Sequence, residues 1–382
     1  MMASLHVPSP VPTAVEPGSQ LDQIDTPALI VDLDRIEANI AAMAALARAH
    51  NLALRPHAKA HKIPDLARRQ VQAGAVGITC QKLGEAEVMA AAGLTDILVA
   101  CQIVGAIKVQ RLLALARRVR LTTVVDSVEG ARPLSDAARA NGMVVDTLLE
   151  VDVGYHRCGV PPDAVAGLAR ALTSDCPGLR IRGLMAYEGH IYKLDGAAQV
   201  DRATRRAYDL LGDAAARLRA AGVAVERVSV GASAGARVAA AHPAVTELRA
   251  GSYIFNDLYQ VRMGHATADD CALSVLATVI SARTPDHAVI DAGAKALTFA
   301  ELPGASGYGL IRGHESAVIG RLADEHGIIS VPPGAPPFRV GERVMIVPND
   351  GSVVVNSFSE LVGIRAGRVE RVWSIAARGC MQ

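Results

Sequence analysis

Residues 76–125 read VGITCQKLGEAEVMAAAGLTDILVACQIVGAIKVQRLLALARRVRLTTVV. Short apolar runs at 76–80, 96–100 and 121–125 alternate here with Ala- and Leu-rich stretches that have an amphipathic pattern. Units of about 20 to 35 residues with this alternation are typical of βα repeats, in which parallel strands lie side by side. We therefore predict a strand for each run and a helix for the stretches between runs, for example over 85–92.

The same alternation continues on both sides of this segment, from about residue 26 to residue 268. Eight such units in about 220 residues fit a closed (β/α)8 TIM barrel better than an open doubly wound sheet. No GxGxxG turn follows the first run, which also argues against a dinucleotide-binding sheet. The other candidate strands are ALIVD (28–32), LALR (52–55), TLLEVDV (147–153), IRGLMAY (181–187), VERVSV (225–230) and TELRAGSYIF (246–255).

The character of the sequence changes near residue 269. Segments such as ALSVLATVISA, HAVIDAG and ERVMIV are rich in β-branched residues, and Gly and Pro turns separate them. No helix-length pattern lies between them, so we expect an all-β domain. The predicted organisation is a disordered or extended Pro- and Ser-rich arm over 1–24, an α/β barrel over 25–268 and a C-terminal all-β domain over 269–382.

The composition argues against several classes of partner. The 382-residue chain has a net charge of +1, one Trp and four Phe, so neither nucleic acid nor an anionic membrane is expected as a partner. No run of 18 apolar residues is present, which argues against a membrane span. The six cysteines form no CxxC pair, and they are expected to be reduced thiols of a cytoplasmic protein.

One group of titratable residues follows a predicted barrel strand directly. RPHAKAHK (55–62) places Lys59 among His57, His61 and Lys62. Residues at this position face the barrel mouth, where (β/α)8 enzymes carry their active sites. A second cation nearby lowers the pKa of a lysine and favours the free amine that Schiff-base chemistry needs. A solvated basic turn explains these residues equally well when they are taken alone.

Two further segments end predicted strands. VSVGASAG (228–235) and ELRAGSYIF (247–255) are rich in small residues, which let backbone N–H groups approach an anion. Barrels of this type often bind phosphate after their last two strands, although most such loops are plain turns. In EVDVGYHRCGV (150–160), Arg157 is a candidate donor to a cofactor ring nitrogen, with a structural pair to Asp152 as the alternative.

Taken together, several motifs resemble the D-threonine aldolase and D-serine dehydratase-like family, which has the alanine-racemase-like fold of pyridoxal-phosphate enzymes. The resemblance extends from Asp25 to Gly379, and the D-threonine aldolase branch is the most similar, through CQK (80–82) and WSIAARG (373–379). It implies pyridoxal 5'-phosphate as cofactor, a small amino acid as substrate and a homodimer. The motifs are TPALIVDLDRIEANI, RPHAKAHK, GITCQKLGEAE, EVDVGYHRCGV, TELRAGSY, VIDAGAKA and DEHGII.

The resemblance also implies roles for single residues. Lys59 matches the Schiff-base lysine, Arg157 the residue near the pyridine nitrogen, and Tyr187 an active-site aromatic residue. Gln81 is expected beside the cofactor, and we count His57, two positions before the lysine, as a further cofactor-binding residue. The residues that match the phosphate cradle are Gly231, Ser233, Gly251, Ser252 and Tyr253.

The chain departs from the family at two places. Family aldolases and dehydratases hold a divalent metal (Mn, Mg or Zn) through a His-x-Asp or His-x-Cys pair, and the matching positions here are Asp350 and Ser352. A serine hydroxyl is a poor ligand, so Asp350 is the one candidate metal ligand. Where the aldolases carry a histidine that helps the substrate hydroxyl, this chain has Lys193, and His190 is either its substitute or the cap of a loop.

These observations favour a pyridoxal-phosphate lyase that splits D-β-hydroxy-α-amino acids, such as D-threonine, into glycine and an aldehyde. The altered metal site favours a metal-independent racemase or epimerase, with Lys59 on one face and Tyr187, His190 or Lys193 on the other. A dehydratase of D-serine or 3-hydroxyaspartate type is a third possibility. A cofactor-binding protein without turnover is a fourth, and the β-domain argues against it.

Overall fold

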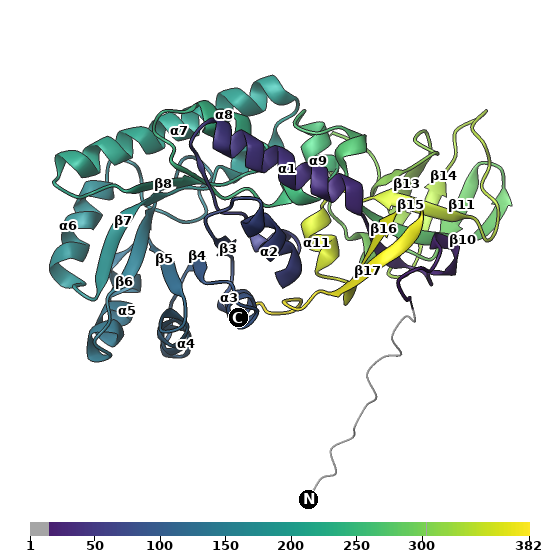
Figure 1. The fold of residues 1–382 in the computed structure, drawn as a ribbon. Coiled ribbons are helices and arrows are strands. Elements are labelled where there is room, and N and C mark those ends of the chain that lie inside the picture. Colours follow the sequence, from purple (N-terminus) through teal and green to yellow (C-terminus); the bar gives the residue numbers. More distant parts are fainter. Residues whose placement is uncertain (1–14, 303) are drawn as a thin grey trace, which may run out of the picture.

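A computed structural model describes residues 15–302 and 304–382 of the chain (Figure 1). Residues 1–14 of the predicted arm lie outside the described residues. The rest of the arm is held against the β-domain, since Gly18 N donates to Val369 O (2.7 Å) and Gln20 forms a bridge with Arg368. The short 3-10 helix η1 (Leu21–Gln23) follows.

Eight parallel strands form the first sheet, in the order β2-β9-β8-β7-β6-β5-β4-β3. A bridge between His57 and Thr79 joins the end of β2 to β3, so that the ring closes. The predicted (β/α)8 barrel is therefore confirmed. Its strands are β2 (Ala53–Leu54), β3 (Ile78–Cys80), β4 (Asp96–Gln102), β5 (Arg120–Val125), β6 (Val145–Glu150), β7 (Leu179–Met185), β8 (Arg227–Val230) and β9 (Glu247–Leu248).

Amphipathic helices cover the outside of the barrel (Figure 1). In the longest, Leu211, Ala215 and Leu218 are fully buried at spacings of four and three residues, which puts them on one helix face. Among the described residues, no helix is both long and apolar enough to span a membrane. The helices are α1 (Leu33–Ala49), α2 (Pro64–Gln72), α3 (Leu83–Ala91), α4 (Ala106–Ala116), α5 (Val128–Ala140), α6 (Val165–Asp175), α7 (Ala197–Ala220) and α8 (Ala236–Ala241).

The second sheet has nine strands and confirms the predicted all-β unit. The exact domain limits stay a prediction. One strand, however, lies in the second sheet and not in the barrel, where we expected it. β1 (Ala28–Asp32), which we placed at the start of the barrel, pairs antiparallel with β10 (Leu273–Thr284) and parallel with β16 (Glu360–Arg365). The other strands are β11 (His287–Ile290), β12 (Leu310–Ile311), β13 (Val318–Leu322), β14 (Gly327–Ser330), β15 (Arg343–Val347) and β17 (Arg368–Ser374).

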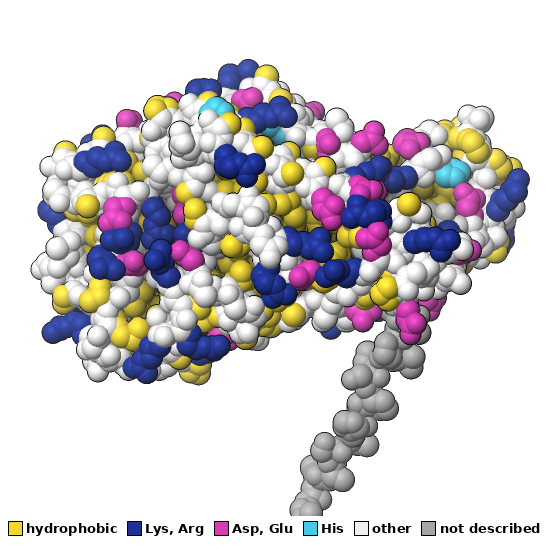
Figure 2. All heavy atoms as spheres, viewed as in Figure 1, with side chains coloured by type: hydrophobic (Ala, Val, Ile, Leu, Met, Phe, Trp, Pro, Cys, Tyr) yellow, Lys and Arg dark blue, Asp and Glu magenta, His cyan; other side chains and the backbone are white. Residues whose placement is uncertain are grey.

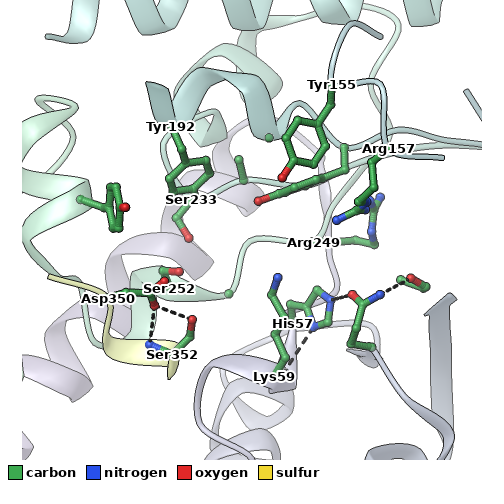
Figure 3. A pocket seen from close by; sticks show the side chains of 18 of the residues that line it. His57, Lys59, Tyr155, Arg157, Tyr192, Ser233, Arg249, Ser252, Asp350 and Ser352 are labelled. Atoms are coloured by element: carbon green, nitrogen blue, oxygen red, sulfur yellow. Dashed lines mark hydrogen bonds between the residues drawn. The ribbon is translucent and has the colours of Figure 1, made fainter. Parts of the chain in front are cut away.

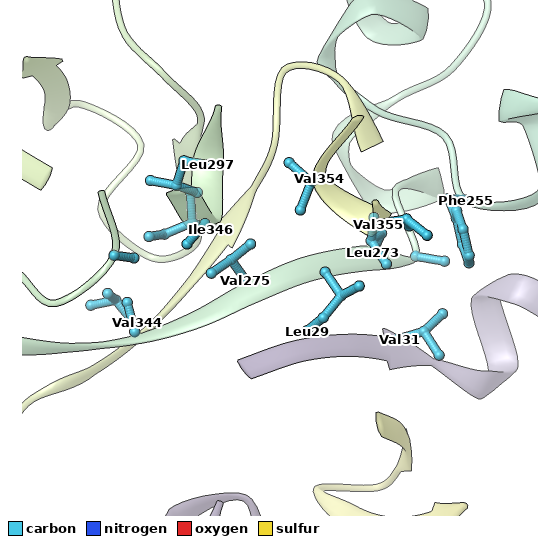
Figure 4. Packing of buried hydrophobic residues seen from close by; sticks show 14 of the residues in the cluster. Leu29, Val31, Phe255, Leu273, Val275, Leu297, Val344, Ile346, Val354 and Val355 are labelled. Atoms are coloured by element: carbon cyan, nitrogen blue, oxygen red, sulfur yellow. The ribbon is translucent and has the colours of Figure 1, made fainter. Parts of the chain in front are cut away.

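The apolar character of β1 explains its place in the second sheet. Leu29 and Val31 are buried in the same cluster as Leu273 and Val275 of β10 (Figure 4). A strand that is apolar on both faces suits the interior of either sheet, and strand pairing alone decides which sheet takes it. The same cluster includes Val354 of the short helix α11 (Gly351–Val355), which contacts the turn that carries Lys59.

A chain of buried polar groups runs through the barrel interior. Arg55 Nε donates to Glu247 Oε2 (2.8 Å), and its Nη1 donates to Asp96 Oδ1 (2.6 Å). Ser229 Oγ donates to Glu247 Oε1 (2.6 Å) and accepts from Arg249 Nη1 (2.7 Å). Arg55 is thereby paired with two acidic side chains, and Arg249 is held near the carboxyl ends of the strands by neutral acceptors, Ser229 Oγ and Ala186 O. The surface, in contrast, shows side chains of both signs interspersed (Figure 2).

Candidate active site

A cavity of about 250 Å³ opens at the carboxyl ends of the barrel strands, where loops of the barrel meet a loop of the β-domain (Figure 3). Residues from strand ends and from the segments 257–259 and 350–352 surround it. The polar and aromatic side chains that line the cavity are His57, Lys59, Gln81, Tyr155, Arg157, Tyr187, Tyr192, Ser233, Arg249, Ser252, Asp257, Tyr259, Asp350 and Ser352.

Lys59 lies in the single turn η2 (Ala58–Ala60), directly after β2, and its amine is 5.7 Å from the centroid of the Tyr187 ring. Burial lowers the pKa of Lys59, and the positive charges of Arg157 and Arg249 lower it further, against the opposing effect of Asp350. The neighbouring Lys62, which we expected to act as the second cation, is paired with Glu85 (3.3 Å). A larger share of the Lys59 amine is therefore unprotonated and nucleophilic than in a free lysine.

The hydrogen bonds of His57 define its tautomer. Gln81 Nε2 donates to Ala100 O (2.8 Å), so Gln81 Oε1 faces His57 Nε2 at 3.3 Å as an acceptor. His57 Nε2 is consequently the donor, and Nδ1 accepts from Lys59 N (3.4 Å). Burial, followed by the charges of Lys59 and Arg249, lowers the pKa of His57 well below its usual range. The His57 ring is therefore neutral and held in one orientation, so it can serve as a flat packing surface beside Lys59.

Arg157 lies against two aromatic rings on the opposite wall. Its guanidinium carbon is 4.9 Å from the Tyr187 centroid and 5.3 Å from the Tyr155 centroid, and the two rings meet edge to face at 5.5 Å. Glu150 lies 3.8 Å from the guanidinium, at the edge of ion-pair distance. The cation is thus held in place mainly by ring contacts and keeps donors free for a ligand.

The predicted anion cradle is present at the ends of β8 and β9. Among the described residues, the backbone N–H groups of Ser233 and Ser252 have no hydrogen-bond partner. A side chain at Gly251 would place its Cβ 3.0 Å from His57 Cβ and His57 O, so any larger residue at this position would crowd His57. Arg249 Nε is buried and also without a partner in the described chain. Unpaired donors of this kind are expected where an anion binds.

Two buried carboxyls lie close to the cavity. Burial raises the pKa of Asp257 to about 8, and the charge of Asp350 raises it too. Burial likewise raises the pKa of Glu188 to about 7, against a hydrogen bond of 2.6 Å from the Tyr208 hydroxyl. Glu188 Oε2 has no hydrogen-bond partner in the described part of the chain. Both carboxyls therefore retain protons at a pH where ordinary carboxyls have lost them.

The chain is similar to known proteins over nearly its whole length. The alanine racemase N-terminal domain matches residues 31–258, and the putative serine dehydratase domain matches 272–364. A D-threonine aldolase of Arthrobacter sp is 38% identical over 97% of this chain and 97% of its own length. The chain belongs to the D-threonine aldolase and D-serine dehydratase-like family. It is therefore an enzyme of this family, with the alanine-racemase-like fold that the sequence motifs implied.

Solved structures agree with this family assignment. The crystal structure of a D-threonine aldolase from Filomicrobium marinum superposes with a TM-score of 0.89 at 36% identity, over 96% of this chain and 100% of that chain. A variant D-threo-3-hydroxyaspartate dehydratase, in its metal-free form, superposes with a TM-score of 0.85 at 35% identity, over 93% and 98% of the two chains. Both enzymes share the barrel and the β-domain with this family member.

The cavity brings together most of the site residues that we predicted for this family member. His57, Lys59, Gln81, Arg157, Tyr187 and Asp350 line it, as do Gly231, Ser233, Gly251 and Ser252 of the cradle. Their roles toward a cofactor or substrate stay predictions.

Three predicted side chains do not line this cavity. Tyr253 is buried behind the cradle, where its hydroxyl accepts from Gln70 Nε2 (2.9 Å). His190 lines a separate hollow beside Gly154, and Lys193 is exposed to solvent at the end of the 3-10 helix η3 (Gly189–Lys193). Gly189 and Tyr192, three residues apart in this 3-10 helix, share the face that lines the cavity, so the side chains of His190 and Lys193 point elsewhere.

Several lining residues were not predicted. Arg249 and Tyr155 lie inside motifs that we quoted, and their strand-end positions are a signal that could have identified them. Asp257 and Tyr259 belong to the start of the short helix α9 (Leu258–Arg262), which ends no barrel strand. Only the packing of α9 against the β-domain loop places them in the cavity, where Leu258 N donates to Pro348 O (3.2 Å).

The residues near Asp350 do not fit the metal site of the family. Asp350 Oδ1 accepts from Ser352 N (3.0 Å), Ser352 Oγ (2.7 Å) and Val353 N (3.2 Å). The nearby Asp257 accepts from Gly351 N (3.1 Å) and Gln260 N (3.2 Å). Among the described residues, no three His, Cys, Asp or Glu side chains lie together as a ligand set. The two positions that match the family's ligand pair thus hold an aspartate that caps a helix and a neutral serine, in place of an imidazole and an anionic side chain.

Proposed function

We propose that this protein is a pyridoxal-phosphate-dependent lyase that cleaves D-β-hydroxy-α-amino acids of the D-threonine type into glycine and an aldehyde. The full-length similarity to a D-threonine aldolase supports the reaction class. The observation that carries the proposal is the Lys59 amine, which has a lowered pKa and lies in a cavity that also contains an anion cradle. A lysine that forms a Schiff base needs this combination.

The lining residues fit pyridoxal phosphate. Ser233 N, Ser252 N and their hydroxyls would hold the phosphate, with Gly231 and Gly251 allowing close approach. Lys59 would hold the aldehyde carbon, Arg157 would face the ring nitrogen, and His57 with Gln81 would pack beside the ring. When bound, this cofactor condenses with amines and withdraws electrons from Cα of the substrate.

The remaining residues act on binding and on protons. The Lys59 amine, when it is not bound to the cofactor, would hold or deliver a proton at Cα of the substrate. Tyr187 stays protonated over the working pH range, since burial raises its pKa, and its ring packs against both Lys59 and Arg157. The aromatic wall of Tyr155, Tyr187 and Tyr192 excludes water from the reacting atoms.

Substrate turnover by the purified holoenzyme tests the reaction class. The protein is offered D- and L-threonine, D-serine and 3-hydroxyaspartate, and the products are identified. We expect an aldehyde and glycine from D-threonine. Ammonia with a 2-oxo acid would instead indicate a dehydratase, the second candidate, which is supported by the 35% identity to a D-threo-3-hydroxyaspartate dehydratase. Loss of optical activity without cleavage would indicate a racemase.

Replacement of the lysine tests the assignment of the cofactor site. In Lys59→Ala, we expect the visible absorbance of the bound cofactor and all turnover to disappear, because no amine remains to hold the aldehyde. Lys62→Ala is the matched control, since this amine is paired with Glu85 and should leave the absorbance in place. Absorbance that survives in Lys59→Ala would show that another group binds the cofactor.

The proposal also includes a homodimer, a cytoplasmic location and a domain boundary between residues 268 and 269, with β1 as a strand of the β-domain sheet. The dimer rests on the family resemblance, and light scattering of the purified protein tests it by mass. The location rests on the six free cysteines, which form no disulfide in the described chain.

A further inference from the structure

Asp350 is the N-cap of α11, and it brings one carboxylate of the β-domain to the barrel mouth (Figure 3). Oδ1 of Asp350 accepts three hydrogen bonds, from Ser352 N, Ser352 Oγ and Val353 N. These contacts fix the orientation of the carboxylate, because two of the donors are backbone N–H groups in the first turn of α11. Oδ2 has no hydrogen-bond donor among the described residues.

The charge of Asp350 is not neutralised by a cation. In the described chain no Lys, Arg or His nitrogen lies within ion-pair distance of this carboxylate, and its three donors are neutral. The cations of the cavity wall are Lys59, Arg157 and Arg249. The charge of Asp350 raises the pKa of Lys59, against the lowering effect of burial. The Asp350 carboxyl group thus has one free oxygen, and it lines the same cavity as Lys59.

The immediate surroundings of Asp350 offer hydroxyls rather than metal ligands. Ser252, Tyr259 and Ser352 line the same part of the cavity, and the closest acid, Asp257, is closed off by two backbone N–H groups. A neutral hydroxyl that already donates to a carboxylate is a poor ligand for Mn²⁺ or Zn²⁺. The same arrangement is well suited to accept a hydrogen bond from a hydroxyl of the substrate.

We infer that Asp350 acts as the general base on the β-hydroxyl of the substrate, without a metal ion between them. This inference rests on the proposed lyase function. The O–H bond breaks, its proton passes to Asp350 Oδ2, and its electron pair forms the carbonyl of the aldehyde. The Cα–Cβ bond breaks and leaves its electron pair on Cα, which takes up one proton to give glycine, so that atoms and charge balance.

Ser352 has a positioning role in this arrangement. Its hydroxyl and its backbone N–H both donate to Oδ1, so the carboxylate presents Oδ2 to the cavity. A bound metal would lower the pKa of a substrate hydroxyl through its charge. Here the same proton is removed by a carboxylate that these hydrogen bonds hold in one orientation.

The test uses purified holoenzyme with D-threonine as substrate and Mn²⁺ as metal probe. After treatment with EDTA, we expect the rate of aldehyde formation to change less than about twofold, and titration calorimetry to show no stoichiometric Mn²⁺ binding. Asp350→Asn should lower kcat by about 100-fold, the usual range for loss of a general base, with the cofactor absorbance unchanged. Asp350→Glu, which keeps a carboxylate, should recover part of the rate.

Asp286→Asn is the matched control, because it removes a carboxylate from an exposed turn of the β-domain that does not line the cavity. Activity that EDTA abolishes and Mn²⁺ restores, together with stoichiometric Mn²⁺ binding, would overturn the inference and leave the lyase proposal standing. Wild-type kcat in Asp350→Asn would overturn it as well. A holoenzyme that forms no aldehyde with or without Mn²⁺ would instead refute the proposed function itself.

Discussion

Glu188 should make the stability of this protein depend on pH. The side chain is fully buried next to the anion cradle, and its pKa is raised to about 7 from the ordinary 4.5, with burial as the main cause. Glu188→Gln replaces the carboxyl by a neutral amide of the same shape. The amide oxygen can still accept the hydrogen bond from the Tyr208 hydroxyl.

The raised pKa determines the sign and the size of the effect. Between pH 4.5 and about 7, Glu188 has lost its proton in the unfolded chain but retains it in the folded protein. Its contribution to stability is therefore complete below pH 4.5 and is lost as the pH rises through 7. At about 1.4 kcal/mol for each pH unit, the loss amounts to about 3 kcal/mol. Glu188→Gln has no group that titrates at this position, so its stability should not show this loss.

Urea unfolding of both proteins at pH 5, 6, 7 and 8, followed by circular dichroism, measures the difference. Every other titrating group contributes equally to both proteins and cancels. We expect the free energy of unfolding of Glu188→Gln, relative to wild type, to rise by about 2–3 kcal/mol between pH 5 and pH 8. In Tyr208→Phe, which removes the donor to Glu188, the loss should move to higher pH. A difference that is constant with pH would refute the assignment of a buried, protonated Glu188.

Two further predictions concern the cradle and the barrel interior. Gly251→Ala should weaken cofactor binding by about tenfold or more in an equilibrium titration, because the new Cβ overpacks against His57. Gly167→Ala, which meets nothing within 4 Å, is its control, and equal affinities in the two variants would contradict the cradle. Arg55→Met should lower the free energy of unfolding by about 3–5 kcal/mol, because the buried Glu247 loses its partner. Adding Glu247→Gln should recover part of this loss, and a single variant as stable as wild type would show that the pair is not needed.

The course of the barrel could be predicted from local patterns. Strands such as β4 and β5 are short apolar runs, and the helix between them shows the spacing of a buried face, with Val109, Leu112 and Leu113 fully buried. The place of β1 could not be predicted in the same way. Its residues are apolar on both faces, so their periodicity does not distinguish a barrel strand from the centre of an antiparallel sheet.

The residues of the candidate site also differ in how far local sequence patterns could predict them. Barrel strands are followed by Lys59, Arg157 and Ser233. The geometry of parallel strands brings residues in such positions to one end of the barrel. His190 and Lys193 were candidates because of the family resemblance, with a loop cap as the alternative for His190, but a 3-10 turn directs both away from the cavity. Asp257 was not expected at all, because its helix reaches the cavity only through contact with the β-domain.

By itself, the order of the amino acids determined the alternation of strands and helices, the lysine at a strand end and the small residues that can surround an anion. These features depend on neighbours in the chain, within a few residues. The tertiary structure alone decided that the Asp350 carboxylate faces the barrel mouth with one free oxygen, and that Glu188 is buried next to the cradle. Such features depend on contacts between segments that are far apart in the sequence, and no local pattern records them.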